Sequence, residues 1–216
     1  MKKIEKFVVL GNGGHSAVIV DLIESLGLQI KGVLTCDINN KHFLEYPVLG
    51  DDSKLNENAF KKFNYAIGVA WVNYSLKTRI RLFENLKRLK LSTPTLIHKT
   101  AIVSSRSYIS DGCQILAGAI VGAESSLGRN CIINTGAKID HGTIIGPNCH
   151  IAPGVTICGN VVIGENTFIG AGTTIINDIK ITKNCTIGAG SLVLKSIVKP
   201  GMYFGSPVKK CVKLVR

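Results

Sequence analysis

The stretch KIDHGTIIGPNCHIAPGVTICGNVVIG, residues 138–164, has a rhythm that runs from Ala101 to Ser196. Divided into sextets from Ala101, this region has Ile, Val or Leu at the third position of all sixteen, from Val103 to Val193. If those three residue types make up about a quarter of an average sequence, chance would give such a series about once in several billion cases. The six-residue repeat is therefore a property of the fold.

Each sextet predicts a short strand followed by a bend. The first position is small or β-branched, and positions four to six collect Gly, Asn and Asp, which tolerate turns and positive φ. The third side chain then points inward. Three such faces make a triangular coil, and about five coils with strands about 4.8 Å apart stack into a prism about 25 Å tall.

The seven cysteines fit this coil better than a disulfide or metal framework. Four of them occupy the first position of a sextet, where we expect a buried, cramped environment. These are Cys113, Cys131, Cys149 and Cys185. No CxxC pair occurs and the total is odd, so the sequence predicts small buried side chains and no metal.

Composition sets further bounds. A chain of 216 residues with 45% hydrophobic residues can bury a sizeable core, and no apolar run reaches the roughly 18 to 20 residues of a membrane span. We expect a cytoplasmic protein. The net charge of +12 has no long basic block, so nucleic-acid binding is not expected. A solvated basic surface and a phosphate-bearing ligand both remain possible explanations of the charge.

Before the repeat, strands alternate with helices. Residues 7–10 predict a strand, GNGGHSA a glycine turn, residues 18–26 a helix and residues 30–34 a second strand, with Asp37 shortly after it. This order is typical of a nucleotide-binding half-Rossmann unit.

The glycine fingerprint of that unit is only partial. Gly11 and Gly13 have the required spacing, but Ser16 stands where the dinucleotide pattern has a third glycine. The glycines still allow a pyrophosphate to approach a helix N-terminus, and a tight turn without a ligand is the alternative. Residues 65–69 then predict a third strand, and residues 75–90 predict an amphipathic helix capped by Ser75 with a basic outer face.

These features, with the junction at residues 96–99 and the closing GSPVK at residues 205–209, resemble one family over essentially the whole chain. It is the family of bacterial hexapeptide-repeat acetyltransferases that act on nucleotide-linked amino sugars or sialic acid. The resemblance implies a Rossmann-like domain, residues 1–97, followed by a left-handed parallel β-helix, residues 98–216. It also implies a homotrimer. Left-handed coils are an exception to the right-handed crossover rule.

The resemblance further assigns the catalytic residues. The segment NTGAKIDH, residues 134–141, is similar to the one that holds the family's catalytic base, and the match falls on His141. Gly159 matches a glycine whose backbone N–H holds the thioester oxygen. Independently, Gly159 follows His141 by 18 residues, which places it one coil further on, about 5 Å along the axis. A base beside an N–H donor suits acyl transfer.

The orientation of the base stays open. Relatives can carry an acidic residue just after the base, but here Gly142 follows, and Asp140 is the nearest carboxylate. Neighbouring residues on a strand point to opposite faces, so Asp140 as the catalytic orienter is a hypothesis. A surface histidine at a coil corner is the alternative for His141.

Ligand contacts are also implied. For acetyl-CoA, besides Gly159, they are His150, Ala171, Gly188 and Lys209. For the nucleotide they are Gly11, Gly13, Gly14, His15 and Asp37, the last near the base or ribose. Excess Lys and Arg would pair with the phosphates of CoA and the nucleotide.

The predicted activity is acetyl-CoA-dependent N-acetylation of an amino-deoxy sugar linked to UDP, dTDP or GDP, at its C4 amine, by direct attack with His141 as general base. O-acetylation of sialic acid or a related polysaccharide sugar is the alternative. A trimeric carbonic anhydrase would need zinc held by three histidines, and the repeat has two. A non-catalytic β-helix subunit would tolerate the loss of His141.

Overall fold

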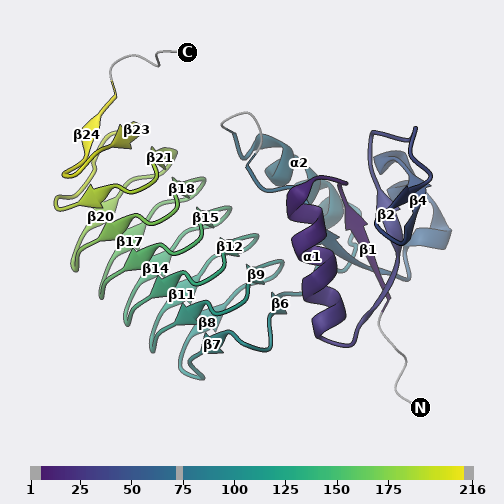
Figure 1. Ribbon diagram of the computed structural model, residues 1–216, viewed down its shortest axis with the longest axis horizontal. Helices are drawn as coiled ribbons and strands as arrows, with labels where there is room; N and C mark the ends of the chain where they lie inside the picture. Colours follow the sequence, from purple (N-terminus) through teal and green to yellow (C-terminus); the bar gives the residue numbers. More distant parts are fainter. Residues whose placement is uncertain (1–5, 72–74, 212–216) are drawn as a thin grey trace. The chain divides into compact units, whose positions relative to one another are not determined.

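The computed structural model describes residues 6–71 and 75–211. The chain divides between Lys99 and Thr100 into two compact units (Figure 1). The first unit contains a sheet and both α-helices, and the second contains the coil.

A mixed sheet with the order β3-β4-β2-β1-β5 forms the centre of the first unit. Its parallel strands are β1 (Lys6–Leu10), β2 (Gln29–Leu34), β4 (Tyr46–Gly50) and β5 (Asn64–Ile67). The short β3 (His42–Phe43) pairs antiparallel with β4, and the 3-10 helices η1 (Asp52–Asn56) and η2 (Asn58–Phe60) precede β5. The predicted order of strand, helix and parallel strand is confirmed.

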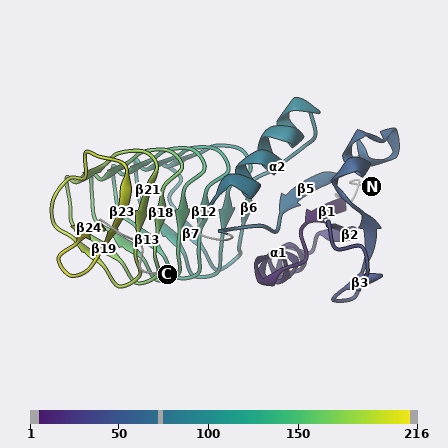
Figure 2. The ribbon, with the colours of Figure 1, turned by 90° about the horizontal axis from the view of Figure 1, so that it is seen from above.

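Two helices cover opposite faces of this sheet (Figure 2). The first, α1 (Gly14–Ser25), begins inside the glycine turn, earlier than the predicted start at residue 18. The second, α2 (Lys77–Arg88), has Leu76 as its N-cap, so Ser75 is not the cap residue. The Ser75 Oγ nevertheless accepts a hydrogen bond from the first helical N–H, that of Lys77, at 3.1 Å. Among the helices of the described ranges, none is long and apolar enough to cross a membrane.

One basic residue of α2 departs from the predicted outer face. Arg79 is buried on the apolar side of the helix together with Leu82, Phe83 and Leu86. These three apolar residues pack in a core with side chains of β1, β2 and β5. The predicted basic outer face is confirmed, because the other basic residues of α2 are exposed: Lys77, Arg81, Lys87 and Arg88. Arg79 is the exception, because its spacing from the leucines places it on the same side of the helix.

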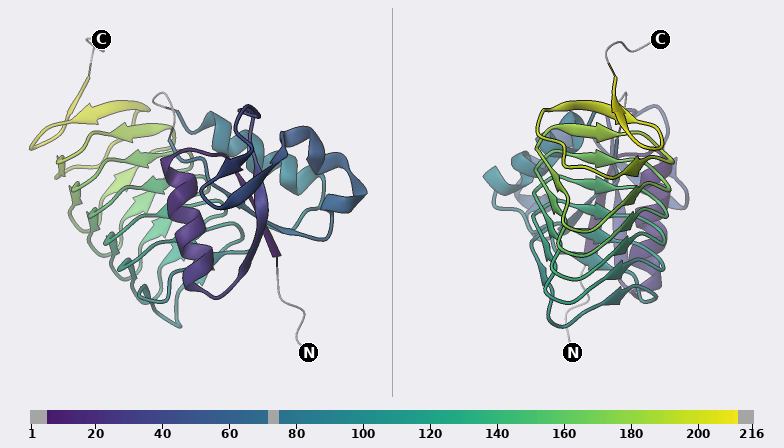
Figure 3. Two further views of the ribbon diagram at one scale, coloured as in Figure 1. Left: turned by 45° about the vertical axis from the view of Figure 1, so that its right-hand side comes forward. Right: turned by 90° about the vertical axis from the view of Figure 1, so that its left-hand side faces the viewer.

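The second unit is a coil of very short strands that recur every six residues (Figure 3). In chain order they are β7 (Ile102–Val103), β8 (Tyr108–Ile109), β9 (Gln114–Ile115), β10 (Ile120–Val121), β11 (Ser126–Leu127), β12 (Ile132–Ile133), β13 (Lys138–Ile139), β14 (Ile144–Ile145), β15 (His150–Ile151), β16 (Thr156–Ile157), β17 (Val162–Ile163), β18 (Phe168–Ile169), β19 (Thr174–Ile175), β20 (Lys180–Ile181), β21 (Cys185–Ile187) and β22 (Leu192–Val193). The two-residue strand β6 (Leu96–Ile97) precedes the coil. Strands β23 (Gly201–Phe204) and β24 (Lys209–Lys210) form a hairpin at its end.

The strands stack into three parallel sheets, which form the three faces of the coil. The first face contains β7, β10, β13, β16, β19 and β22; the second contains β8, β11, β14, β17 and β20; the third contains β9, β12, β15, β18 and β21. Partners in neighbouring coils are 18 residues apart, as for Lys138 and Thr156. The predicted three-faced coil is confirmed.

Side-chain burial and backbone angles follow the sextets. Every third-position residue from Ile115 to Val193 is buried, whereas Val103 and Ile109, in the first coil, are half-buried. Every sixth-position residue from Gly112 to Gly190 has positive φ, and Gly, Asn, Asp or Glu occupies it. Gly, Asn and Asp tolerate the left-handed backbone that the bends require, and Glu124 is the one exception in residue type.

The column of cysteines is buried as predicted. In three of them the Sγ donates to a carbonyl of the next coil at 3.2 Å, for example from Cys131 to Gly146. Burial raises the pKa of the Cys131 thiol well above its usual range. A thiol held in this way stays protonated and is a poor nucleophile.

Candidate functional site

The candidate catalytic corner lies between the first and second faces of the coil. Strand β13 ends at Ile139, the chain bends through Asp140, His141 and Gly142, and β14 follows. The sharp part of the bend is at Gly142, where φ is 65°. His141 immediately precedes Gly142 and is exposed, so its imidazole is available to a ligand.

Gly159 occupies the same corner one coil further on, and the His141 ring lies against it. A Cβ added to Gly159 would lie 2.6 Å from Cε1 and 2.7 Å from Nε2 of His141. The N–H of Asn160 donates to the His141 carbonyl at 2.9 Å, which ties the two coils together at this point. The structure therefore brings the predicted base and the predicted N–H donor together, and the ring fits only because residue 159 has no side chain.

Asp140 is bonded to the main chain of the base. Its Oδ1 accepts the His141 N–H at 2.7 Å, and its carbonyl accepts the Ser125 Oγ at 2.9 Å. The carboxylate thus fixes the backbone from which the imidazole projects. This hydrogen bond runs to the main chain of His141 and not to its ring.

His150 is at the outward position of β15 on the third face, and it is nevertheless buried. Its ring packs edge-to-face on Phe168 with 5.1 Å between centroids, and its Nε2 is 3.2 Å from Nδ2 of Asn134. The neighbouring outward side chains Gln114 and Ile132 are buried as well. The sequence pattern predicts an outward direction for these residues but does not reveal that they are covered.

The other residues predicted for acetyl-CoA lie near that face. Ala171 and Gly188 are at the corner between the third and first faces, and Lys209 is exposed in β24. A Cβ added to Gly188 would lie 2.8 Å from Cβ of Phe204, which belongs to the closing hairpin. Within one chain, these residues and the corner with His141 and Gly159 are on different edges of the coil.

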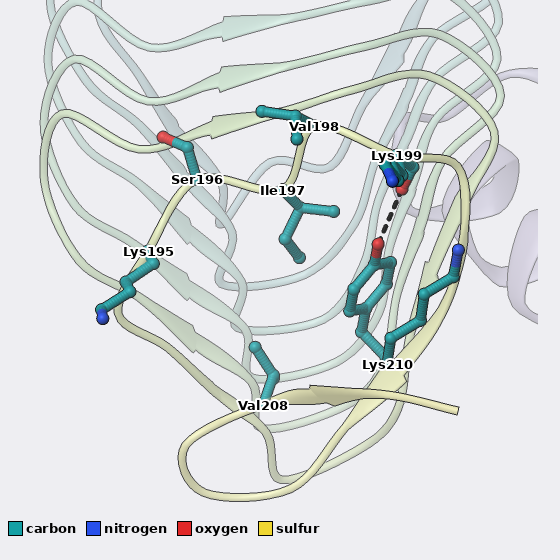
Figure 4. A pocket seen from close by; sticks show the side chains of 8 residues that line it. Lys195, Ser196, Ile197, Val198, Lys199, Val208 and Lys210 are labelled. Atoms are coloured by element: carbon teal, nitrogen blue, oxygen red, sulfur yellow. Dashed lines mark hydrogen bonds between the residues drawn. The ribbon is translucent and has the colours of Figure 1, made fainter. Parts of the chain in front are cut away.

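A hollow of about 230 Å³ opens at the C-terminal end of the coil (Figure 4). Its lining combines basic and apolar side chains: Lys195, Ser196, Ile197, Val198, Lys199, Tyr203, Val208 and Lys210. The Tyr203 hydroxyl donates to the Lys199 carbonyl at 2.8 Å. The predicted Lys209 does not line this hollow, and sequence reasoning did not single out the three lysines that do.

The glycine turn of the first unit joins β1 to α1. Gly11 has a φ of 112°, and its N–H donates to the Leu34 carbonyl of β2 at 2.8 Å. A Cβ added to Gly13 or Gly14 would meet nothing within 4 Å. Gly13 is the N-cap residue of α1, and the half-buried His15 lies in the first turn of that helix. The turn is therefore open at a helix N-terminus, where N–H groups favour anions.

The missing third glycine has a structural explanation in Gly68. The Ser16 Oγ donates to the Gly68 carbonyl at 3.0 Å, in a buried position. A Cβ on Gly68 would overlap the Ser16 side chain. The room that a glycine at position 16 would give is supplied instead by a glycine on the chain that follows β5.

Asp37 lies beside this turn, beyond the end of β2. Its Oδ2 accepts hydrogen bonds from the side chains of Asn12 at 3.4 Å and Asn40 at 3.3 Å. Thr35 donates to the Asn12 Oδ1 at 3.0 Å. The structure therefore brings Asp37 and the glycine turn together at the carboxyl ends of β1 and β2, where open α/β sheets bind ligands.

No group of three or more His, Cys, Asp or Glu side chains that could hold a metal ion is found in residues 6–71 and 75–211.

Two protein families match the chain. Residues 6–86 match the PglD N-terminal domain, and residues 124–159 and 160–195 each match the bacterial transferase hexapeptide family of six repeats. A comparison with curated proteins found no match.

Solved structures resemble the chain over nearly its full length. The acetyltransferase domain of PglB from Neisseria gonorrhoeae is 30% identical, with a TM-score of 0.88 over 96% of this chain and 100% of that domain. Another structure of that domain contains acetyl coenzyme A. Perosamine N-acetyltransferase from Caulobacter crescentus is 27% identical, with a TM-score of 0.91 over 98% of this chain and 99% of that one. That structure contains CoA and GDP-perosamine in a variant with asparagine in place of a histidine.

A more distant structure, WeeI from Acinetobacter baumannii, is 20% identical with a TM-score of 0.85 over 96% of this chain and 100% of that one, and it shows the fold alone. Together these likenesses confirm the predicted fold class, a Rossmann-like domain followed by a left-handed parallel β-helix.

Proposed function

The chain belongs to the bacterial hexapeptide-repeat sugar acetyltransferases that carry a PglD N-terminal domain, and on that premise we propose that it transfers the acetyl group of acetyl-CoA to the C4 amine of a nucleotide-linked amino-deoxy sugar. The observation that carries the proposal is the exposed His141 imidazole packed on Gly159 at one corner of the coil. Two solved relatives support it, since the structure of one contains acetyl-CoA and that of the other contains CoA with GDP-perosamine.

In the proposed reaction His141 acts as general base. The amine nitrogen attacks the thioester carbonyl carbon and forms the C–N bond, while the imidazole takes a proton from that nitrogen. The backbone N–H of Gly159 stabilises the oxyanion of the tetrahedral intermediate. Collapse breaks the C–S bond, and the thiolate of CoA leaves and is protonated. Asp140 keeps the base in place through the His141 main chain.

The acceptor's nucleotide is proposed to bind at the glycine turn of the first unit. The open surface over Gly13 and Gly14, at the start of α1, suits a diphosphate. His15 lies in the same turn, and Asp37 offers a carboxylate to ribose hydroxyls or to N–H groups of a base. GDP is the first nucleotide to test, because a relative contains GDP-perosamine.

A thiol-release assay tests this function. Acetyl-CoA is supplied with GDP-, UDP- and dTDP-linked 4-amino sugars, and the matching 4-hydroxy sugars serve as controls. We expect CoA release with one nucleotide-linked amino sugar and none with its hydroxy counterpart, and mass spectrometry should find the acetyl group as an amide. Acetylation of sialic acid with no reaction of any amine would contradict N-acetyl transfer and favour the O-acetyl alternative.

We also propose that the enzyme works as a trimer. The corner of His141 and Gly159 and the edge near Ala171 and Gly188 are apart in one chain. In a cleft between two copies, the His141 corner of one copy would lie beside the Ala171 edge of the other. Outward positions on the first and second faces carry exposed apolar side chains that such contacts would cover: Ile102, Tyr108 and Ile144.

Native mass spectrometry tests the assembly. We expect a species of three times the chain mass, and we expect Ile144→Asp to dissociate it and to lower kcat/KM for acetyl-CoA at least about tenfold, because a buried charge would oppose the contact. Ile38→Asp, at a comparably exposed apolar residue of the first unit, is the matched control and should leave the trimer intact. A monomer with full activity would overturn the trimer.

A further inference from the structure

Arg79 is a charged side chain inside the core of the first unit. It is 2% exposed and shares the buried side of α2 with Leu82 and Phe83. Burying a guanidinium costs free energy that an apolar residue at the same helix position would not cost. The position therefore calls for a role beyond filling the core.

The guanidinium holds the chain where β5 ends. Its Nη1 donates to the carbonyls of Ile67 and Val69, both at 3.0 Å. Strand β5 is at the edge of the sheet, next to β1. Between these two carbonyls, Gly68 bonds in other directions: its N–H donates to the Leu10 carbonyl at 2.8 Å, and its own carbonyl accepts the Ser16 hydroxyl. One side chain thus fixes both neighbours of Gly68.

The segment that Arg79 holds is the wall of the glycine turn. A Cβ added to Gly11 would lie 3.0 Å from Val69 Cγ2 and 3.4 Å from the Gly68 carbonyl oxygen. Ser16, which bonds to Gly68, lies in the first turn of α1. Any shift of Gly68 and Val69 would therefore pass directly to the turn and to the N–H groups at the start of α1.

We propose that Arg79 is a positioning residue for the nucleoside diphosphate of the acceptor, an inference that rests on the function proposed above. By fixing residues 67–69 it holds the glycine turn and the start of α1 in the geometry that receives the phosphates. Its positive charge is buried beside the Ile67 and Val69 carbonyls, where water and salt screen it less than at the surface. Arg79 touches no reacting atom in this account, and it acts through Val69 and Gly68.

The test separates nucleotide binding from the chemistry. Arg79→Lys keeps a charge and a donor, Arg79→Met keeps only the apolar stem, and Arg81→Met, at a side chain 64% exposed on the same helix, is the matched control. Calorimetry measures the Kd of GDP, UDP and dTDP alone, and kinetics give kcat and KM for the sugar and for acetyl-CoA. We expect Arg79→Met to raise the cognate Kd and the sugar KM at least about tenfold, and Arg79→Lys to raise them less. The KM for acetyl-CoA and kcat at saturation should stay within about twofold.

A purely structural role would give a different pattern, because partial unfolding lowers the amount of active enzyme and so lowers kcat with both KM values unchanged. That pattern, or unchanged nucleotide affinity in both variants, would overturn the positioning role. If Arg79→Met does not fold, Arg79→Lys carries the same test. If the wild-type enzyme acetylates sugars but Arg79→Lys and Arg79→Met bind nucleotide with unchanged Kd, only the positioning role is overturned and the proposed function stands. A wild-type enzyme that binds none of the three nucleotides removes both.

Discussion

Replacing His141 by alanine should lower kcat about 10²- to 10⁴-fold and leave both KM values within a few-fold of the wild type. The imidazole is exposed at the corner and lies against Gly159, so its removal deletes the base without removing a core contact. The loss should fall on the proton transfer, since the glycine turn and the rest of the coil remain. Initial rates with the accepted sugar, and calorimetric binding of CoA and of the nucleotide sugar, measure the two parts separately.

The matched control is His42→Ala, which removes an exposed histidine of β3 in the first unit. It should keep full activity. Unfolding of His141→Ala, seen by circular dichroism, would mean that the side chain has a structural role. Full activity in a folded His141→Ala protein would show that another group takes the proton and that His141 is only a surface histidine at a coil corner.

The coil was predictable because its backbone repeats. A bend that needs positive φ selects Gly or Asn at the sixth position, and an inner face selects an apolar third residue, so Asn148 and Ile145 each report their place in the coil. The repeat also fixes which residues are neighbours along the axis. For this reason the closeness of His141 and Gly159 follows from their separation of 18 residues.

What the sequence did not predict depends on contacts between segments with no common repeat. The glycine fingerprint has Ser16 in place of its third glycine, and the sequence does not show that Gly68, far along the chain, leaves room for the serine side chain. Arg79 belongs to a helix rich in Lys and Arg, and its burial depends on which side of α2 faces the sheet. A spacing of three and four residues to Leu82 and Phe83 is the signal that could have identified it. The hydrogen-bond partner of Asp140 was likewise not predictable from the sequence, because a carboxylate next to a histidine can bond either to its ring or to its main chain.

Replacing Gly159 by alanine should lower kcat about 10²-fold or more with little change in thermal stability. The new Cβ would lie 2.6 to 3.2 Å from three atoms, all of which belong to the His141 ring. That ring is the exposed end of a flexible side chain, so it can swing away at little cost to folding. The base would then leave the position in which it is held next to the Gly159 N–H. Initial rates and thermal melts of the same preparations measure both effects.

Gly146→Ala is the matched control, because its Cβ would also meet an atom at 2.6 Å, but that atom is the main-chain nitrogen of Glu165. A backbone cannot swing away, so this variant should melt at a lower temperature while the folded fraction keeps its kcat. The double variant His141→Ala with Gly159→Ala completes the argument. If the methyl group acts by displacing the imidazole, it has nothing left to displace once His141 is gone, and the double variant should be no slower than His141→Ala alone. A further large loss in the double variant would mean that alanine at position 159 blocks the thioester or its N–H donor directly, and the packing of His141 on Gly159 would then not explain the defect.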